Sequence, residues 1–176
     1  MTNRWTFRRP VKLIGNDRLM RIVQFYVWET PVPNTSRKGK TFRELGWRGH
    51  GFLKLQAAMR DCSALTNTNW VACATKDIEV ELEGKKRLTN FDCSFEFAIH
   101  TVKDGLNKTE ALFYLIRNGF AHGGFRLCEF GGETFYVFES KDRSKLKGRA
   151  ILREKTLLAW MQIVLEGPAG LSKRNR

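Results

Sequence analysis

Residues 107–124 read NKTEALFYLIRNGFAHGG, and we expect the rest of the chain to fold around the helix that this stretch predicts. An apolar run leads to three polar side chains, Arg117, Asn118 and His122, and the stretch ends at two glycines. On an ideal helix Asn118 and His122 lie about 40° apart, whereas Arg117 and His122 lie roughly 140° apart. The arginine and the histidine can therefore meet only if the helix loosens at Gly119 or if a second chain supplies a facing copy.

Cap signals and apolar residues at three- and four-residue steps predict the helices. Asn107 and Glu110 have the spacing of a capping box, so the motif helix should begin there. The last predicted helix stops at the Gly167-Pro168 pair. The other predicted helices cover residues 17–29, 52–62 and 91–102, and the last covers residues 154–166.

Alternating and β-branched patterns predict strands before and after the motif helix. Ile78, Val80 and Leu82 alternate with glutamates, which predicts a surface strand in a hairpin that turns at residues 84–87. Gly131-Gly132 separates two aromatic-rich runs and predicts a second hairpin. The expected strands are residues 77–83, 125–130, 134–139 and 146–152.

The length and the balance of these elements bound the fold class. A chain of 176 residues suits one domain with a single core. The prediction is a mainly α (α+β) domain over residues 1–170, followed by a basic tail at residues 171–176. We expect Trp28, Trp47, Trp70 and Trp160 to fill its core rather than to stack on bases.

The charge points to an acidic partner. A formal net charge of +13 and an isoelectric point near 10.0 favour nucleic acid first and an anionic membrane second, with solubility as the alternative. Basic residues are frequent in the second half of the chain, where they form either a track for an RNA backbone or an ordinary basic surface. The candidates are Arg126, Lys141, Arg143, Lys145, Lys147, Arg149 and Arg153.

The cysteines and histidines give no sign of a cofactor. Cys62, Cys73, Cys93 and Cys128 include no Cys-x-x-Cys pair, so we expect small buried residues in a reducing compartment rather than a disulfide frame or a zinc site. With three histidines in the chain, no metal is expected. No segment resembles a signal peptide or reaches membrane-spanning length, so we expect a soluble cytoplasmic protein with no membrane partner.

The sequence RNGFAH at residues 117–122 resembles the motif of the HEPN superfamily (higher eukaryote and prokaryote nucleotide-binding domains), in which an arginine precedes a histidine by four to six positions. The hairpin, the sequence FESKD and a closing helix with Leu-Leu-x-Trp are similar to HEPN-like proteins carried by plasmids and phages. The resemblance covers about residues 107–168. Arg43 and His50 satisfy the looser spacing too, but they lack the Arg-Asn pair and lie in a glycine-punctuated stretch that we expect to be a loop.

The resemblance implies a HEPN-like bundle of about four to five helices, with β-hairpins inserted before and after the motif helix. Family members typically dimerise with their motif helices facing one another, so it also implies a homodimer with a shared active site. Many are metal-independent endoribonucleases in toxin, defence or RNA-processing systems, which implies RNA as the substrate here and a toxin or anti-phage role. An antitoxin or another protein is a further candidate partner. Some relatives are regulated on a tyrosine two residues after the histidine, but Gly124 stands there in this chain.

Metal-independent RNA cleavage needs a base for the 2′-hydroxyl proton, an acid for the leaving 5′-oxygen, and donors for the charge on phosphorus. We assign proton transfer to His122 because an imidazole exchanges protons near neutral pH. Arg117 would hold the scissile phosphate, and Asn118 would orient the imidazole or the phosphate. The alternative is a catalytically silent HEPN-like module that binds RNA or a protein.

Overall fold

The computed structural model describes residues 15–35, 39–88 and 93–174. Its centre is a mixed sheet with strand order β1-β2-β5-β4-β3. β1 runs parallel to β2, and the remaining neighbours are antiparallel. The strands are β1 Trp70–Cys73, β2 Phe97–Thr101, β3 Phe125–Phe130, β4 Glu133–Asp142 and β5 Lys145–Arg153.

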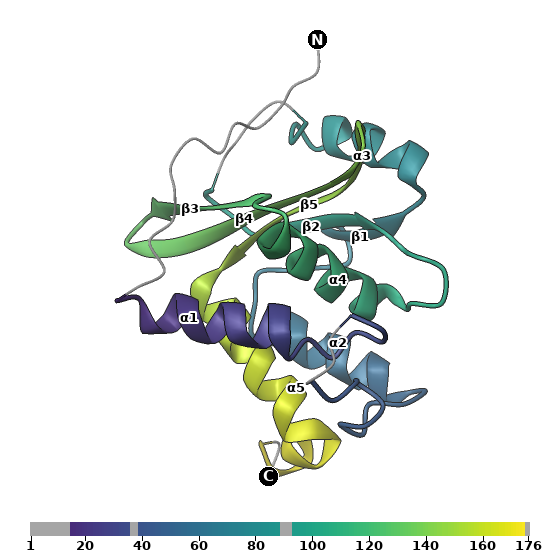
Figure 1. Cartoon of the computed structure of the whole chain (residues 1–176), viewed down its shortest axis with the longest axis vertical. Helices are drawn as coiled ribbons and strands as arrows, with labels where there is room; N and C mark the ends of the chain where they lie inside the picture. The colour runs from purple at the N-terminus through teal and green to yellow at the C-terminus, as the bar shows by residue number, and fades with distance from the viewer. Residues whose placement is uncertain (1–14, 36–38, 89–92, 175–176) are drawn as a thin grey trace.

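Helices cover both faces of this sheet (Figure 1). α4 lies against one face with α1, α2 and α5 beyond it, while α3 packs on the opposite face. α5 contains a kink at Gly167, whose φ is 68°, and then continues into the predicted basic tail. The helices are α1 Asp17–Val23, η1 Gln24–Trp28, α2 Gly51–Asp61, η2 Thr75–Asp77, α3 Ile78–Gly84, α4 Lys108–Ala121 and α5 Glu154–Arg174.

The five-stranded sheet overturns the expected helical bundle. The chain is an α+β protein whose strands are not insertions into a bundle but form the layer on which the helices pack. One hydrophobic cluster joins α1, α2, α4 and α5 to Ala98, Tyr136, Phe138 and Leu152. A second cluster joins α3 to the residues on the other face of the same strands.

The predicted strand at residues 77–83 is wrong, because this segment is helix α3. Ile78 and Leu82 are buried, while Val80 is 68% exposed. Burial at positions i and i+4 is the pattern of a helix that covers one face of a sheet, whereas a strand would bury all three apolar residues together. The predicted hairpin at residues 84–87 is therefore absent from the structure.

The predicted helix at residues 91–102 is also wrong, since Phe97–Thr101 forms the central strand β2; residues 91 and 92 lie outside the described part. Phe95 and Val102, two members of the supposed helical stripe, are 43% and 45% exposed. Four consecutive residues from Phe97 are buried instead. A strand that is covered on both faces carries a continuous apolar run, which gives no period of two in the sequence.

Other predicted elements are confirmed. The helix at residues 17–29 appears as α1 and η1, and the Asn16 side chain caps it by accepting from the Leu19 amide at 2.9 Å. The capping box of Asn107 and Glu110 opens α4 as expected. The helix at residues 52–62, the hairpin around Gly131-Gly132, the strand at residues 146–152 and the start of the last helix also agree with the structure.

The cysteine and tryptophan predictions hold only in part. Cys93 and Cys128 form a disulfide between the segment before β2 and strand β3, which contradicts the expectation of four unpaired thiols. Cys62 and Cys73 are free. Trp28 is 57% exposed and is not a core residue. Trp47, Trp70 and Trp160 are fully buried, as predicted.

Two glycines let the end of α4 approach β4 closely. A Cβ on Gly119 would lie 2.8 Å from the ring of Phe138, and one on Gly124 would lie within van der Waals overlap of the Glu139 carbonyl oxygen. The Glu139 amide donates to the Gly124 carbonyl at 2.7 Å. The helix end and the turn that follows it are therefore fixed against the middle of the sheet.

We expect Gly124→Ala to destabilise the fold by about 2 kcal/mol or more, because the backbone of β4 must move away and its hydrogen bond is strained or lost. Denaturation by urea measures the change. Gly84→Ala is the matched control, because a Cβ there meets open space at the end of α3. Equal stability of both variants would show that the close approach at Gly124 is unimportant.

Candidate functional site

A pocket of about 540 Å³ lies beside α4, where the helix ends over the sheet. Its size is within the usual range for small-molecule and cofactor sites. Helix α4 contributes Tyr114, Asn118 and His122 to its wall. The opposite wall comes from the loop after β2, the end of β4 and the start of β5, and its charged residues are Lys103, Asp104, Lys141, Asp142 and Lys147.

The three polar residues from α4 share one face because they are spaced by four residues. Successive steps of four turn an ideal helix by about 40°, so Tyr114, Asn118 and His122 follow a shallow diagonal across the pocket wall. His122 is the C-cap, with its amide bonded to the Asn118 carbonyl at 3.0 Å, and its side chain is exposed. The end of α4 therefore presents the imidazole to the pocket.

Arg117 lies outside this pocket. α4 remains helical through Gly119 to Ala121, so the loosening that would bring Arg117 toward His122 does not occur. Arg117 lines a second hollow of about 290 Å³ on the other side of Tyr114. Within one chain the structure thus brings Asn118 and His122 into one pocket and places Arg117 in the adjoining hollow.

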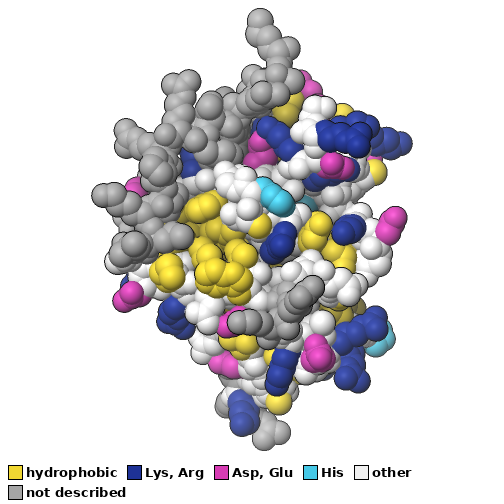
Figure 2. Space-filling view, in the orientation of Figure 1, with side chains coloured by type: hydrophobic (Ala, Val, Ile, Leu, Met, Phe, Trp, Pro, Cys, Tyr) yellow, Lys and Arg dark blue, Asp and Glu magenta, His cyan; other side chains and the backbone are white. Residues whose placement is uncertain are grey.

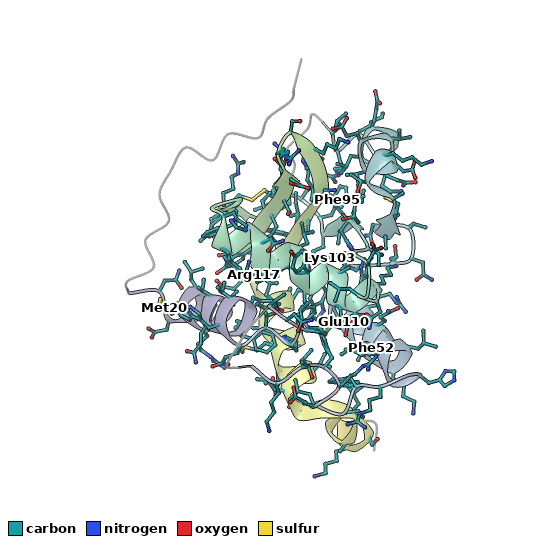
Figure 3. All side chains as sticks on the ribbon, turned by 45° about the vertical axis from the view of Figure 1, so that its right-hand side comes forward. Met20, Phe52, Phe95, Lys103, Glu110 and Arg117 are labelled. Carbon is teal, nitrogen blue, oxygen red and sulfur yellow. A yellow bond between two sulfur atoms is a disulfide. The ribbon has the colours of Figure 1, made fainter. Side chains whose placement is uncertain are left out.

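Hydrogen bonds link the two hollows along the ridge between them. Arg117 Nη1 donates to Asn118 Oδ1 at 3.1 Å, and Lys103 Nζ donates to the Tyr114 hydroxyl at 3.4 Å. The Lys103 ammonium also lies 4.7 Å from the centre of the Tyr114 ring, a cation–π contact. Figure 3 shows Lys103 and Arg117 on the same side of the molecule.

This network lowers the pKa of Tyr114 below its ordinary value. The largest cause is a hydrogen bond from the Asn118 side chain, and the Lys103 ammonium and the Arg117 guanidinium add to it. Each of these groups favours the phenolate over the phenol. Tyr114 is therefore a more acidic hydroxyl than an isolated tyrosine, and it stands between the two hollows.

The pocket lysines differ in how firmly their partners hold them. Lys147 donates to Thr75 Oγ1 at 3.4 Å and lies 4.0 Å from an Asp142 carboxylate oxygen. Lys141 pairs with Glu139. No carboxylate of the described residues forms an ion pair with Lys103. The Lys147–Asp142 pair is exposed and contributes little stability, so an anion could replace Asp142 at low cost, whereas the Glu139 carboxylate is buried.

The predicted basic track does not form one continuous surface. Lys141 and Lys147 line the pocket, and Arg143 lies at the tip of the β4–β5 turn between them. Arg149 is 1% exposed and donates to Glu139 Oε2 at 2.5 Å, so it belongs to the interior. Arg153, which lies roughly 20 Å along the strand from Lys147, pairs with Glu133.

Arg126, Arg149 and Arg153 also share the sheet face that α3 covers. They stand in register with Val137, Glu139 and Phe135 on β4, and that face is the opposite one from α4. Burial lowers the pKa of Arg126. Lys145 is exposed at the start of β5. Only part of the predicted track can therefore serve the pocket beside His122.

His100 is a buried histidine at the edge of the same pocket, and its protonation state is fixed by its neighbours. The Trp70 indole donates to His100 Nε2 at 3.2 Å, and His100 Nδ1 lies 3.1 Å from the Thr101 carbonyl oxygen. Because an indole can only donate, Nε2 accepts and Nδ1 carries the proton. Burial is the main cause that lowers the pKa of His100 to about 4.

Lys103 and Tyr114 are two pocket residues that the sequence prediction missed. A signal for Tyr114 was present, because it precedes Asn118 by four residues and His122 by eight. Lys103 gave none, since it lies in a loop that precedes α4 and comes beside Tyr114 only in the fold. The alternative pair of Arg43 and His50 lies in turns before α2, as expected.

Neither a metal-binding group, a membrane helix nor a known relative indicates the function of the pocket, so its chemistry is argued from the described residues that line it. The described residues hold no group of three or more His, Cys, Asp or Glu placed to bind a metal ion. None of their helices combines the length and the hydrophobicity that a bilayer crossing needs. Comparison with known protein families, with characterised proteins and with solved structures finds no match to the chain.

We expect the free energy of unfolding to fall as the pH drops from about 6.5 toward 4, partly because of His100. Native His100 stays neutral in this range, whereas an unfolded histidine binds a proton, so protonation favours unfolding. The shift corresponds to a contribution on the order of 3 kcal/mol. In His100→Gln this part of the pH dependence should disappear, as measured by urea denaturation at each pH. His50→Gln, at an exposed position, should keep it.

Proposed function

We propose that this protein is a metal-independent endoribonuclease whose proton-transfer residue is His122. The observation that carries the proposal is the pocket in which His122 faces Lys103, Lys141 and Lys147. A titratable imidazole beside several cations is suited to moving a proton at a phosphodiester while the charge on phosphorus is stabilised. The net charge of +13 supports an RNA backbone as the ligand.

The type of reaction comes from the RNGFAH motif and its resemblance to the HEPN superfamily, and so does the proposed role as a toxin or anti-phage effector. The fold lends that resemblance no support, because a mixed sheet is not a helical bundle. The pocket supports the proposed chemistry separately from the resemblance, since His122 shares it with three lysines, whose ammonium groups are suited to binding a phosphate.

In the proposed reaction the ribose 2′-oxygen attacks phosphorus and the bond to the 5′-oxygen breaks. A base takes the 2′-hydroxyl proton, and an acid supplies a proton to the leaving oxygen. The products are a 2′,3′-cyclic phosphate and a 5′-hydroxyl. DNA lacks the attacking hydroxyl and should resist. His122 performs one transfer, and the three lysines hold the phosphate.

The second candidate function is an RNA-binding module without turnover. The observation that favours it is the separation of Arg117 from His122 within one chain, which leaves a single motif residue of the expected catalytic pair in each hollow. Such a module would bind RNA through the same lysines and leave it intact.

We expect His122→Ala to lower the rate of cleavage of total RNA in EDTA by roughly 10²- to 10⁴-fold, because one proton transfer loses its catalyst. Gel analysis of the RNA measures the loss, and end-group analysis of the parent's products should find the cyclic phosphate. His50→Ala is the matched control, since it removes an exposed histidine at the start of α2. RNA that both the parent and His122→Ala bind but leave intact would support the module instead.

We also propose that the active unit is a homodimer, because the reaction needs two proton transfers and each chain brings one histidine of the motif. A second copy's His122 would then supply the other group. Light scattering should find a dimer, and the cleavage rate per chain should fall when the protein is diluted below the dissociation constant. A monomer with a constant rate per chain would contradict this proposal.

A further inference from the structure

The hollow that contains Arg117 adjoins the His122 pocket. Lys103, Asp104 and Tyr114 line both, so the two hollows are separated only by this ridge. Around the axis of α4, Arg117 is about 60° to one side of Tyr114, and Asn118 and His122 are on the other side. A flexible single-stranded nucleic acid that passes over Tyr114 can therefore contact both hollows.

The Arg117 side chain has hydrogen-bonding capacity left for a ligand. One guanidinium nitrogen, Nη1, is bonded to Asn118. Nε is buried and has no hydrogen-bond partner among the described residues. Buried donors are usually satisfied in folded proteins, and one that is not calls for a missing partner such as a bound anion. The guanidinium forms no ion pair with a carboxylate of the described chain.

Charge and shape favour a phosphate as that anion. Lys103 stands on the ridge with its ammonium directed to Tyr114 rather than to a carboxylate. A guanidinium offers a planar fork of donors that matches two oxygens of a phosphate. Asp104, which also borders the hollow, is a carboxylate that can accept from ribose hydroxyls or base amino groups beside the phosphate.

We propose that the Arg117 hollow is a second phosphate subsite, which binds the RNA phosphate next to the one that is cleaved beside His122. Arg117 is then a substrate-positioning residue, not a group that stabilises the reacting phosphorus. The identification of the ligand as RNA rests on the proposed function. Recognition of a second phosphate does not require turnover, so binding can be tested separately from cleavage.

The test uses 2′-O-methyl oligonucleotides, which cannot be cleaved because the attacking hydroxyl is blocked. One has a single phosphate and the next has two. Binding is followed by NMR at the His122 imidazole, assigned with His122→Ala. The parent protein should bind the two-phosphate compound more tightly than the one-phosphate compound.

Arg117→Ala should lower the affinity for the two-phosphate compound about tenfold or more, and it should change the affinity for the one-phosphate compound less than twofold. The salt dependence of the longer ligand should fall by about 0.7 in logarithmic slope, as for one lost contact to a single strand. Arg117→Lys should restore part of the affinity. Arg43→Ala removes the same charge at an exposed position outside both hollows and should leave both affinities unchanged.

Three results would overturn the inference. An equal loss for both compounds would place Arg117 at the phosphate beside His122, and no loss for either, or no binding by the parent, would exclude the subsite. Cleavage of total RNA by the parent and not by His122→Ala would stand in each case, so the nuclease proposal and the subsite proposal fail separately. Circular dichroism and thermal denaturation confirm that each variant is folded.

Discussion

The close approach of the end of α4 to β4 is the constraint on which the site depends. The Gly124 carbonyl accepts the Glu139 amide, and Gly119 lies against the ring of Phe138. Side chains at either glycine would hold the helix away from the sheet. Because the backbone is fixed on both sides of His122, the imidazole is held at the pocket wall although its side chain forms no hydrogen bond with another described residue.

The alternation of side chains along β5 explains why the charged residues of the hairpin divide into two groups. On a strand that is covered on both faces, neighbouring side chains point to opposite sides, so Arg149 faces α3 and pairs with Glu139. The register shifts between Ser140 and Lys141, and two more residue pairs follow before the hairpin turns; Lys141 and Lys147 line the pocket at this end. A single basic stretch of sequence thus supplies both an interior ion pair and two of the lysines that line the pocket.

Local signals in the sequence predicted the elements that local chemistry determines. The capping box at Asn107 and the Gly131-Gly132 turn both depend on residues a few positions apart. The wrong predictions concern segments whose structure depends on packing against residues that are distant in the sequence. The alternation from Ile78 is typical of a strand, and only the exposure of Val80 in the structure shows that the segment is a helix with one buried side. The burial of β2 can be predicted only when the helices on both faces of the sheet are known. The disulfide between Cys93 and Cys128 likewise joins residues 35 positions apart, and no rule of cysteine spacing predicts it.

For the site, sequence reasoning found Asn118 and His122 because their helical spacing is a local property. The same angles had already placed Arg117 on another face, and the unbroken helix keeps it there. The separation suits the two cation types. Lysine is a flexible point charge that can follow oxygens as charge moves during a reaction, whereas the arginine fork suits a phosphate whose geometry does not change. In the proposed arrangement, a helix that presents His122 to the lysines and turns Arg117 toward the adjoining hollow therefore matches each cation to the phosphate that it fits.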